Sequence, residues 1–340
     1  FVDRNHRDNP KTKDSHNGLY GFFRAAIDCI FVNTLYHKLP STDSLKTTVR
    51  NYATNMLGSL YTRTHNDRSW ETNPAQSPSC GFIAMAFATA YGYVAQETTY
   101  RTRALEAAQA INRYYTQNAS KLSGDPMVSD DCIHSELTNN IMAIMGAGLA
   151  DVAVHLYPGN PQNFPYRNAL TTLGNYARYS KNSDNNLWRY GGGSNEELAP
   201  GLKAKCAMRL GYDVWTVAGL AKIAVGTTYT LPPSTPSSVF WNTARTGVSG
   251  LQTLRNLNNR FPEFTGGGYT DNVSSSSKPA YVLPVSWAKE QSLFDTAIND
   301  LGGYDRAAQD ESGGNSSEEN FHRLLWGLAG AMEYNLTVLK

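Results

Sequence analysis

Groups capable of acid–base chemistry gather at the start of one long apolar run, in the segment Asp131–Asn140, which reads DCIHSELTNN. Histidine can give or take a proton near neutral pH, and an amide or protonated imidazole can neutralise a carboxylate. At 100° per residue, His134 falls on the same helix face as Asp131, while Glu136 and Asn140 favour other faces. We therefore assign a catalytic role to His134 and Asn139. The simpler alternative, that Asp131 caps a helix and His134 is an ordinary helix residue, stays open.

A second candidate is the loop Trp188-Arg189-Tyr190, which three glycines follow. Aromatic rings can stack on a sugar ring, and an arginine can clamp a carboxylate with two parallel hydrogen bonds. Tyr190 is then a candidate acid or base and Arg189 its catalytic neighbour, with Trp188 as a binding platform. The alternative is that the aromatic residues only anchor a long loop.

Other polar and aromatic residues lie at the ends of apolar runs, where they could contact a ligand. Arg68 and His65 share a loop with Trp70, His16 and Asn17 precede the first run, and His322 and Arg323 begin the last. We assign substrate binding to Trp188, Trp70, His65, Arg68, His16, Asn17, Tyr20, His322 and Arg323. A solvated connection explains the first group equally well, and Glu318 and Glu319 read as helix-capping residues.

Common catalytic signatures are absent from the chain: it contains no G-x-S-x-G, H-E-x-x-H, P-loop or G-x-G-x-x-G sequence. The four cysteines, Cys29, Cys80, Cys132 and Cys206, form no C-x-x-C pair, so a zinc ribbon is not expected. We expect no metal and no other cofactor. The cysteines lie in or beside apolar runs and are expected to be core thiols, although two disulfides are the alternative.

The elements that position these residues are expected to be helices of two kinds. Apolar runs begin near residues 18, 80, 131, 202, 285 and 319, and most are followed by an amphipathic stretch. The apolar helices are expected at Gly18–Leu39, Cys80–Val94, Asp131–His155, Leu202–Val225 and Phe321–Leu339. The amphipathic helices are expected at Leu45–Tyr61, Thr99–Tyr115, Tyr166–Tyr179 and Val239–Asn258, and a further helix is expected at Trp287–Leu301. Helices that are apolar all round are typical of an inner layer, and amphipathic helices of an outer one.

This alternation predicts an all-α fold, an incomplete (α/α)5–6 toroid of helical hairpins with long loops on one face. We expect residues 1–340 to form a single toroid domain. The segments expected as loops include Thr62–Ser79, with two prolines, and Phe261–Lys278, with three consecutive glycines and four consecutive serines.

The charge and composition of the chain limit the classes of partner that it is expected to bind. The net charge of +1 offers no basic surface for nucleic acid or an anionic membrane, and no apolar run is long enough to span a bilayer. Only 17% of the residues are charged, while uncharged polar and aromatic residues are abundant. We expect a secreted or periplasmic monomer that binds a polysaccharide, with any leader removed before Phe1.

In architecture the chain resembles the (α/α) toroids of carbohydrate-active enzymes, and in size and helix-pair number the alginate-lyase-like polysaccharide lyases. The nearest local similarity is Asp131–Asn140, which lacks the Asn-Asn-His-x-Tyr/Trp order of that family. The resemblance implies β-elimination on a uronate-containing glycan. Two alternatives stay open: a glycoside hydrolase with paired carboxylates drawn from Glu71, Asp130, Asp131, Glu196, Glu197 and Glu290, and a non-catalytic glycan-binding protein.

Overall fold

The structure is a computed structural model. It describes residues 19–72, 78–123, 138–160, 163–179, 186–188, 208–230, 237–262, 264–265, 277–303 and 316–336. The statements below concern these residues.

The helices form two layers. The inner layer consists of α3 (Leu19–Lys38), α6 (Ser79–Thr89) with its π-helical extension η1 (Ala90–Val94), α9 (Asn139–Leu156), α11 (Leu210–Thr230), the 3-10 helix η3 (Pro279–Ala288) and α15 (Ser316–Glu333). The outer layer consists of α4 (Lys46–Asn66), α7 (Thr98–Gln117), α10 (Arg167–Tyr179), α12 (Ser237–Asn258) and α13 (Gln291–Asp300). Two short helices, α5 (Ser69–Thr72) and α8 (Ala119–Ser123), lie in the connections.

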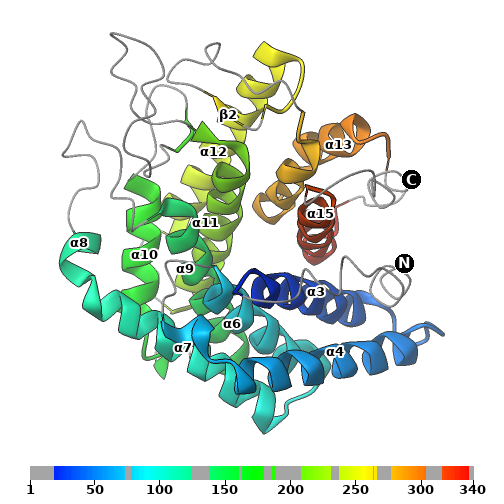
Figure 1. Cartoon of the computed structure of the whole chain (residues 1–340), viewed down its shortest axis with the longest axis vertical. Helices are drawn as coiled ribbons and strands as arrows, with labels where there is room; N and C mark the ends of the chain where they lie inside the picture. The colour runs from blue at the N-terminus through cyan, green and yellow to red at the C-terminus, as the bar shows by residue number, and fades with distance from the viewer. Residues whose placement is uncertain are drawn as a thin grey trace.

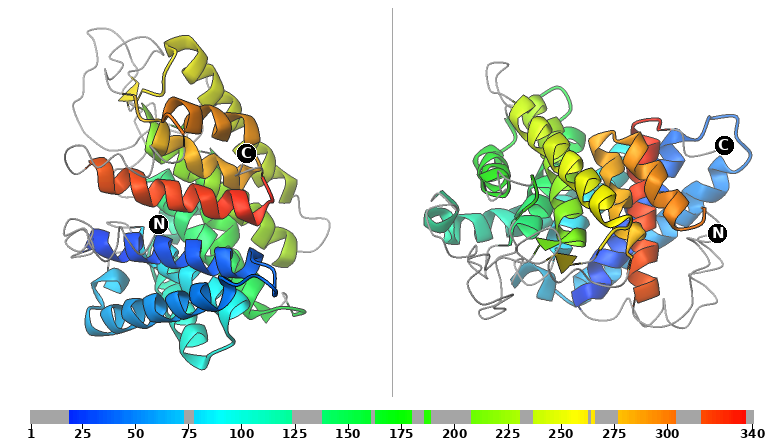
Figure 2. Two further views of the ribbon diagram at one scale, coloured as in Figure 1. Left: turned by 90° about the vertical axis from the view of Figure 1, so that its right-hand side faces the viewer. Right: turned by 90° about the horizontal axis from the view of Figure 1, so that it is seen from above.

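The inner helices form a closed ring (Figure 1). Each packs against the next, from α3 through α6, α9, α11 and η3 to α15, and α15 packs back against α3. Each outer helix covers the inner element that precedes it, as α4 covers α3 and α12 covers α11. Figure 2 shows α3, α4 and α15 running side by side in its left-hand view. The described part of the chain thus has six inner and five outer elements, which confirms the expected all-α fold.

Small residues let the inner helices approach closely. A Cβ on Gly148 of α9 would lie 2.7 Å from the carbonyl oxygen of Gly81 in α6, and one on Gly219 of α11 would lie 2.7 Å from Cβ of Ala143. Neither helix pair could approach this closely with a larger residue at these positions. The alanine- and glycine-rich composition of the apolar runs is therefore a packing requirement of the ring.

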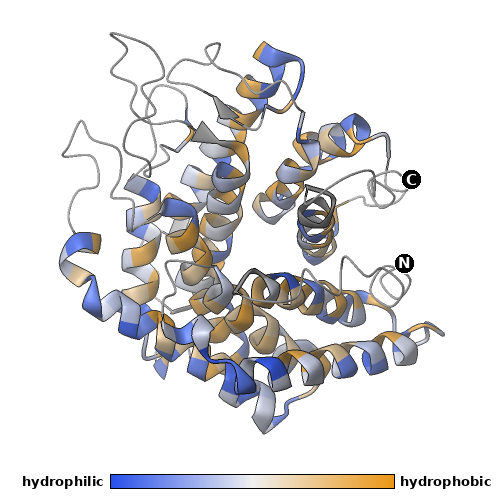
Figure 3. Ribbon diagram, viewed as in Figure 1, coloured by the Kyte–Doolittle hydropathy of each residue, from blue (hydrophilic) through white to orange (hydrophobic). Residues whose placement is uncertain are grey.

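Outer helices bury one face only. In α7, Ala104, Ala107, Ala108 and Ile111 recur at three- and four-residue spacing and are fully buried. Figure 3 shows the hydrophilic residues of the outer helices α4 and α7 on their outward side. The buried apolar residues of both layers form one continuous cluster. No helix among the described residues combines the length and apolar character needed to cross a bilayer.

The segment before α13 differs from the expectation. A helix was expected from Trp287 to Leu301, but the chain forms the 3-10 helix η3 first, turns at Lys289 with φ of 58°, and then begins α13 at Gln291. Pro284 lies inside η3, and proline cannot donate the backbone hydrogen bond that an α-helix needs there. The fifth inner element is therefore a 3-10 helix.

Two expected loops contain regular structure. β2 (Phe264–Thr265), in the loop expected over Phe261–Lys278, pairs antiparallel with β1 (Met208–Arg209), and Pro262 forms an isolated β-bridge with Ser277. Because β1 lies inside the helix expected at Leu202–Val225, that part of the prediction is wrong, and α11 begins at Leu210. α4 runs on to Asn66 and is followed by α5, so the connection expected over Thr62–Ser79 is helical in part.

Candidate functional site

The inner helices run in the same direction, so their N-termini lie at one end of the ring. Residue numbers at the close contacts increase in the same direction on neighbouring helices. Gly219 and Gly226 of α11 contact Ala143 and Ala150 of α9, and Gly327 and Gly330 of α15 contact Leu283 and Ser286 of η3. The residues at the helix N-termini therefore share one end, which we call the N-terminal end.

Arg323 is the central cation of this end. Its guanidinium carbon lies 3.8 Å from the ring centroid of Tyr281 in η3 and 5.1 Å from that of Trp215 in α11. A Cβ on Gly211 would lie 2.7 Å from Arg323 Nη1, so the side chain reaches back to the first turn of α11. Two aromatic rings thus hold the guanidinium plane, and stacking of this kind fixes an arginine for recognition of a planar anion. The residue is only 3% exposed, so direct contact with a glycan requires its surroundings to move.

Beside Arg323, His322 forms a buried pair with Asp28 of α3. His322 Nδ1 lies 2.9 Å from Asp28 Oδ1, and the two side chains are 2% and 0% exposed. A carboxylate that accepts from Nδ1–H fixes the imidazole tautomer and leaves Nε2 as the basic nitrogen. The pair can therefore act as an oriented base.

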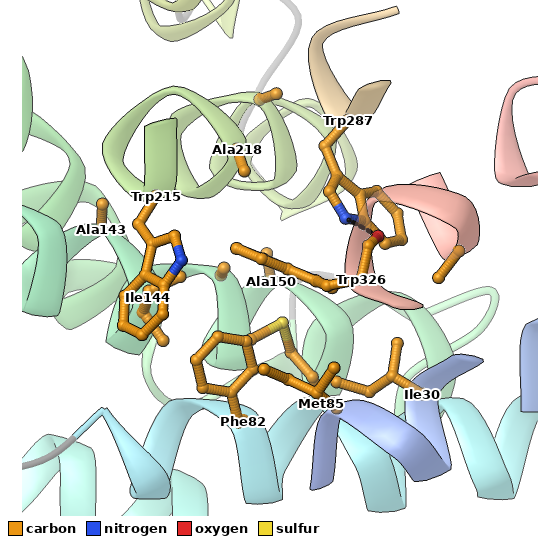
Figure 4. Close-up of a cluster of buried hydrophobic side chains, with 14 of the residues drawn as sticks. Ile30, Phe82, Met85, Ala143, Ile144, Ala150, Trp215, Ala218, Trp287 and Trp326 are labelled. Carbon is orange, nitrogen blue, oxygen red and sulfur yellow. Dashed lines mark hydrogen bonds between the residues drawn. The ribbon is translucent and has the colours of Figure 1, made fainter. Parts of the chain in front are cut away.

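An aromatic cluster that includes Phe82, Trp215 and Trp326 lies between the inner helices (Figure 4). Trp215 contacts Phe82 edge-on at 5.6 Å between centroids and Phe23 at 5.8 Å, and Phe82 contacts Trp326 at 5.0 Å. Its residues come from α3, α6, α11 and α15 and fill the centre of the ring. The polar groups thus lie next to an apolar region that excludes water, and electrostatic interactions there are stronger than in water.

Asn139 lies at the same end as Arg323. It is the first residue of α9 and is 1% exposed, and the next residue, Asn140, is 3% exposed. Tyr20 is the second residue of α3. The structure therefore brings four of the predicted site residues, Asn139, Tyr20, His322 and Arg323, to the N-terminal end of the ring.

Trp188 lies elsewhere, between the layers. Its indole N–H donates to the Ala177 carbonyl of α10 at 2.6 Å, and its ring packs against Gly247 of α12. It is 1% exposed. The ring is enclosed between α10 and α12, and this position fits the alternative that Trp188 anchors its loop.

Asp213 interacts with the same segment. Its Oδ1 accepts the Trp188 backbone N–H at 3.1 Å, and burial raises its pKa well above the usual value, against the opposing effect of that hydrogen bond. Trp215 lies two positions after Asp213, so the two side chains leave α11 on nearly opposite faces. Asp213 thus faces the outer layer rather than the ring centre.

The predicted Arg68–Trp70 group forms a packed junction. Trp70 is 1% exposed, and its indole N–H donates to the Thr64 carbonyl at 3.0 Å. The Arg103 guanidinium donates to the same carbonyl at 3.1 Å. Arg68 pairs with Glu71 and with Glu106. His65 is exposed and stacks on Tyr61. Of this group only His65 and part of Arg68 are accessible to a ligand.

The remaining predicted site residues lie outside the described residues: His134, Tyr190, Arg189, His16 and Asn17. Cys132 and Cys206 lie outside them too, whereas Cys29 and Cys80 are free and buried, as expected of core thiols. No group of three or more metal-ligating side chains occurs in the part of the chain that the structure describes.

Three residues of the site, Asp28, Trp215 and Tyr281, were not assigned to it from the sequence. Asp28 lies in the middle of an apolar helix, and an acid in such a run is a detectable signal, because a buried carboxylate needs a partner. Tyr281 lies between the expected loop Phe261–Lys278 and the expected helix Trp287–Leu301, and its proximity to Arg323 depends on the docking of η3 against α15. No local signal marks it.

Comparisons with known proteins agree with the fold. No family model matches the chain, and no curated protein matches it. Among solved structures, the chain is similar to one named "Polysaccharide Lyase BACCELL_00875", with a TM-score of 0.54 and 11% identity over 94% of this chain and 92% of that one. At this identity the similarity concerns the fold alone, and it agrees with the helical architecture described above.

Proposed function

We propose that the protein is a polysaccharide lyase that cleaves a uronate-containing glycan by β-elimination at the N-terminal end of the ring. The observation that carries the proposal is the Arg323 guanidinium held between Tyr281 and Trp215, next to the His322–Asp28 pair. The similarity of fold to a polysaccharide lyase supports it. A secreted or periplasmic location and a monomeric state belong to the same proposal, since a polymeric glycan does not cross a membrane unaided.

The reaction needs three functions. One group neutralises the uronate carboxylate so that the C5 proton becomes acidic, a base removes that proton, and an acid protonates the leaving oxygen at C4. The C5–H electron pair forms the C4–C5 double bond as the C4–O bond breaks. Two glycan fragments leave the enzyme, and one of them carries the unsaturated uronate at its new non-reducing end.

The described residues can supply the first two functions. Arg323 is suited to the carboxylate because its fork can donate two parallel hydrogen bonds, and Asn139 can assist from α9. His322, oriented by Asp28, is suited to the proton transfer. His134, Tyr190 and Arg189 remain proposed catalytic residues, with Tyr190 as the acid or base.

A hydrolase on the same scaffold finds less support among the described carboxylates. Such an enzyme needs two carboxyl groups about 5–10 Å apart across the scissile bond. Asp28 is paired with His322, Asp213 faces the outer layer, and Glu71 forms ion pairs with Arg68 and Arg113. Hydrolysis is therefore an outcome of the test rather than a second proposal.

The test is incubation with polymers of mannuronate, guluronate, galacturonate and glucuronate. We expect the ultraviolet absorbance of the unsaturated uronate to rise on at least one polymer. The matched control is the same polymer with its carboxyl groups reduced to alcohols, which should be inert because its C5 proton is no longer acidic. New reducing ends without absorbance would show a hydrolase, and binding without either product would show a glycan-binding protein.

A further inference from the structure

A second polar site lies toward the opposite end of the ring, where the inner helices end. A cavity of about 60 Å³ is lined there by Tyr93 of η1, Asp151 and His155 of α9, Lys222 of α11, Trp287 of η3 and Glu333 of α15. About 10–15 Å³ suffices for one water, so the cavity has room for several water-sized groups. Val225, 43% exposed, lies on its rim.

The cavity walls carry two ion pairs. Lys222 Nζ lies 2.9 Å from Asp151 Oδ1, and both side chains are less than a tenth exposed. Lys38 Nζ lies 3.8 Å from Glu333 Oε2, while Glu333 Oε1 accepts the Tyr93 hydroxyl at 3.1 Å. The ammonium group of Lys222 also lies 3.9 Å from the Trp287 ring centroid.

Three hydroxyl donors of these walls are engaged, whereas two carboxylate oxygens accept no hydrogen bond. Thr89 donates to the Met85 carbonyl, Thr34 to the Ile30 carbonyl, and Tyr93 to Glu333. Asp151 Oδ2 and Glu333 Oε2 are buried and accept no hydrogen bond. Buried carboxylate oxygens are rarely left without a donor, so the cavity suits a ligand that brings N–H or O–H groups.

Helix ends add partial negative charge to the two ion pairs of this cavity. α3, α9 and α15 contribute their last turns to this end of the ring, and the C-terminus of a helix carries partial negative charge. Burial lowers the pKa of His155 to about 4, so its imidazole adds no positive charge at neutral pH. The Tyr93 and Tyr334 rings add aromatic surface that attracts cations.

We propose that this cavity binds a small primary amine in its protonated form, with the ammonium group donating to Asp151 Oδ2 and Glu333 Oε2. A bare metal ion is less suited, because no group of three metal-ligating side chains exists among the described residues. The short alkyl stem of the amine lies toward Val154 and Val225 at the rim. The site is separate from the proposed glycan site, so either can fail without the other.

The test measures binding of propylammonium chloride to the full chain by ligand-observed saturation-transfer NMR. We expect saturable binding that sodium chloride at equal ionic strength does not abolish, and none for 1-propanol, the neutral analogue. E333Q keeps an acceptor for Tyr93 but loses the charge, and it should bind about tenfold more weakly or worse. The matched control is E97Q, which removes an exposed carboxylate at the start of α7 and should bind as the wild type does.

A second variant leaves all buried charges intact. V225W fills the rim from an exposed position and should abolish binding while the protein remains folded. Failure to saturate, equal binding of 1-propanol, or unchanged binding by both E333Q and V225W would overturn the proposal.

Discussion

Arg323 shows how neighbouring helices can give a charged residue a defined role. The rings of Tyr281 and Trp215 both contact the guanidinium group, while His322, the preceding residue, contacts Asp28 of α3 instead. Successive residues on a helix diverge by about 100°, so one turn of α15 supplies two functional groups to two neighbours.

Replacing Arg323 by lysine keeps the charge but removes the planar fork and the stacking. We expect kcat/KM for β-elimination to fall at least about 100-fold, the range seen when one preorganised donor is lost. R255K is the control, because Arg255 makes an exposed ion pair with Asp300 in the outer layer, and its activity should stay near that of the wild type. An R323K enzyme with full activity would exclude Arg323 from the site.

Asp28 is a positioning residue, and D28N tests that role. The amide no longer selects the His322 tautomer, so we expect kcat to fall roughly 10- to 100-fold with little change in KM. H322A should act differently: it leaves Asp28 buried without its partner and should lower the free energy of unfolding by about 3–5 kcal/mol. Steady-state kinetics and urea unfolding separate the two effects; a D28N enzyme with unchanged kcat would contradict the assignment.

Asp213 should make stability depend on pH. Its folded-state pKa lies well above the usual value, so the folded protein binds more protons than the unfolded chain between those two values. Stability should therefore fall as the pH rises through the ordinary aspartate range toward the folded-state pKa. D213N removes the titration and should raise the free energy of unfolding at pH 7 by roughly 1–3 kcal/mol. Unfolding at pH 4 and pH 7 is the measurement, and a less stable D213N protein at pH 7 would show that the charged form is stabilised.

At the scale of the elements, the inner ring depends on close helix contacts. Gly81 of α6 and Gly148 of α9 face each other, and the nearest atoms to a Cβ at Gly148 include backbone atoms, which cannot rotate away. Side chains also join the helices: Asn33 of α3 donates to the Ala86 carbonyl of α6 at 3.0 Å, and Trp287 of η3 to the Trp326 carbonyl of α15 at 3.1 Å.

Replacing a glycine by alanine should have opposite effects on the free energy of unfolding in the inner and outer layers. G148A should lower the free energy of unfolding by about 1–3 kcal/mol, because overpacking moves one helix against another. G58A, in the outer helix α4, has no atom within 4 Å of the new Cβ and should raise it by about 0.5–1 kcal/mol through helix propensity. Thermal or urea unfolding of both proteins gives the comparison. Equal effects of the two would contradict close packing of the inner ring.

At the scale of the whole molecule, closure of α15 on α3 joins the two ends of the described chain. Buried residues of every inner element belong to one apolar cluster. We therefore expect the inner ring to open cooperatively rather than helix by helix.

Cys29 and Cys80 report on that cooperativity. Both are buried in the inner layer, and burial raises the pKa of each thiol, so the reactive thiolate is disfavoured. We expect neither to react with a maleimide under native conditions, and both to react at the rate of global unfolding. Mass spectrometry of the peptides gives the rates, with a denatured sample as control. Rapid labelling of one cysteine alone would show local opening of its helix.

The sequence by itself determined the helical class and the two layers. Periodicity is a local property, so α3, α7, α10 and α12 begin and end within a few residues of their expected bounds. It also indicated that His322 and Arg323 lie near the start of an inner helix, whereas Asn139, expected inside a helix from Asp131, is the first residue of α9. It did not separate Trp70 and Trp188 from accessible aromatic residues, because burial depends on neighbours distant in sequence.

Only the tertiary structure decided which groups meet. The His322–Asp28 pair joins residues 294 positions apart, and the Lys222–Asp151 pair and the Arg323–Tyr281 contact likewise join separate helices. The form of η3 also depended on context, since a proline within an apolar run fits either a broken helix or a loop. Secondary structure follows from local periodicity, whereas a site follows from helix packing, and packing depends on the side chains of several helices at once.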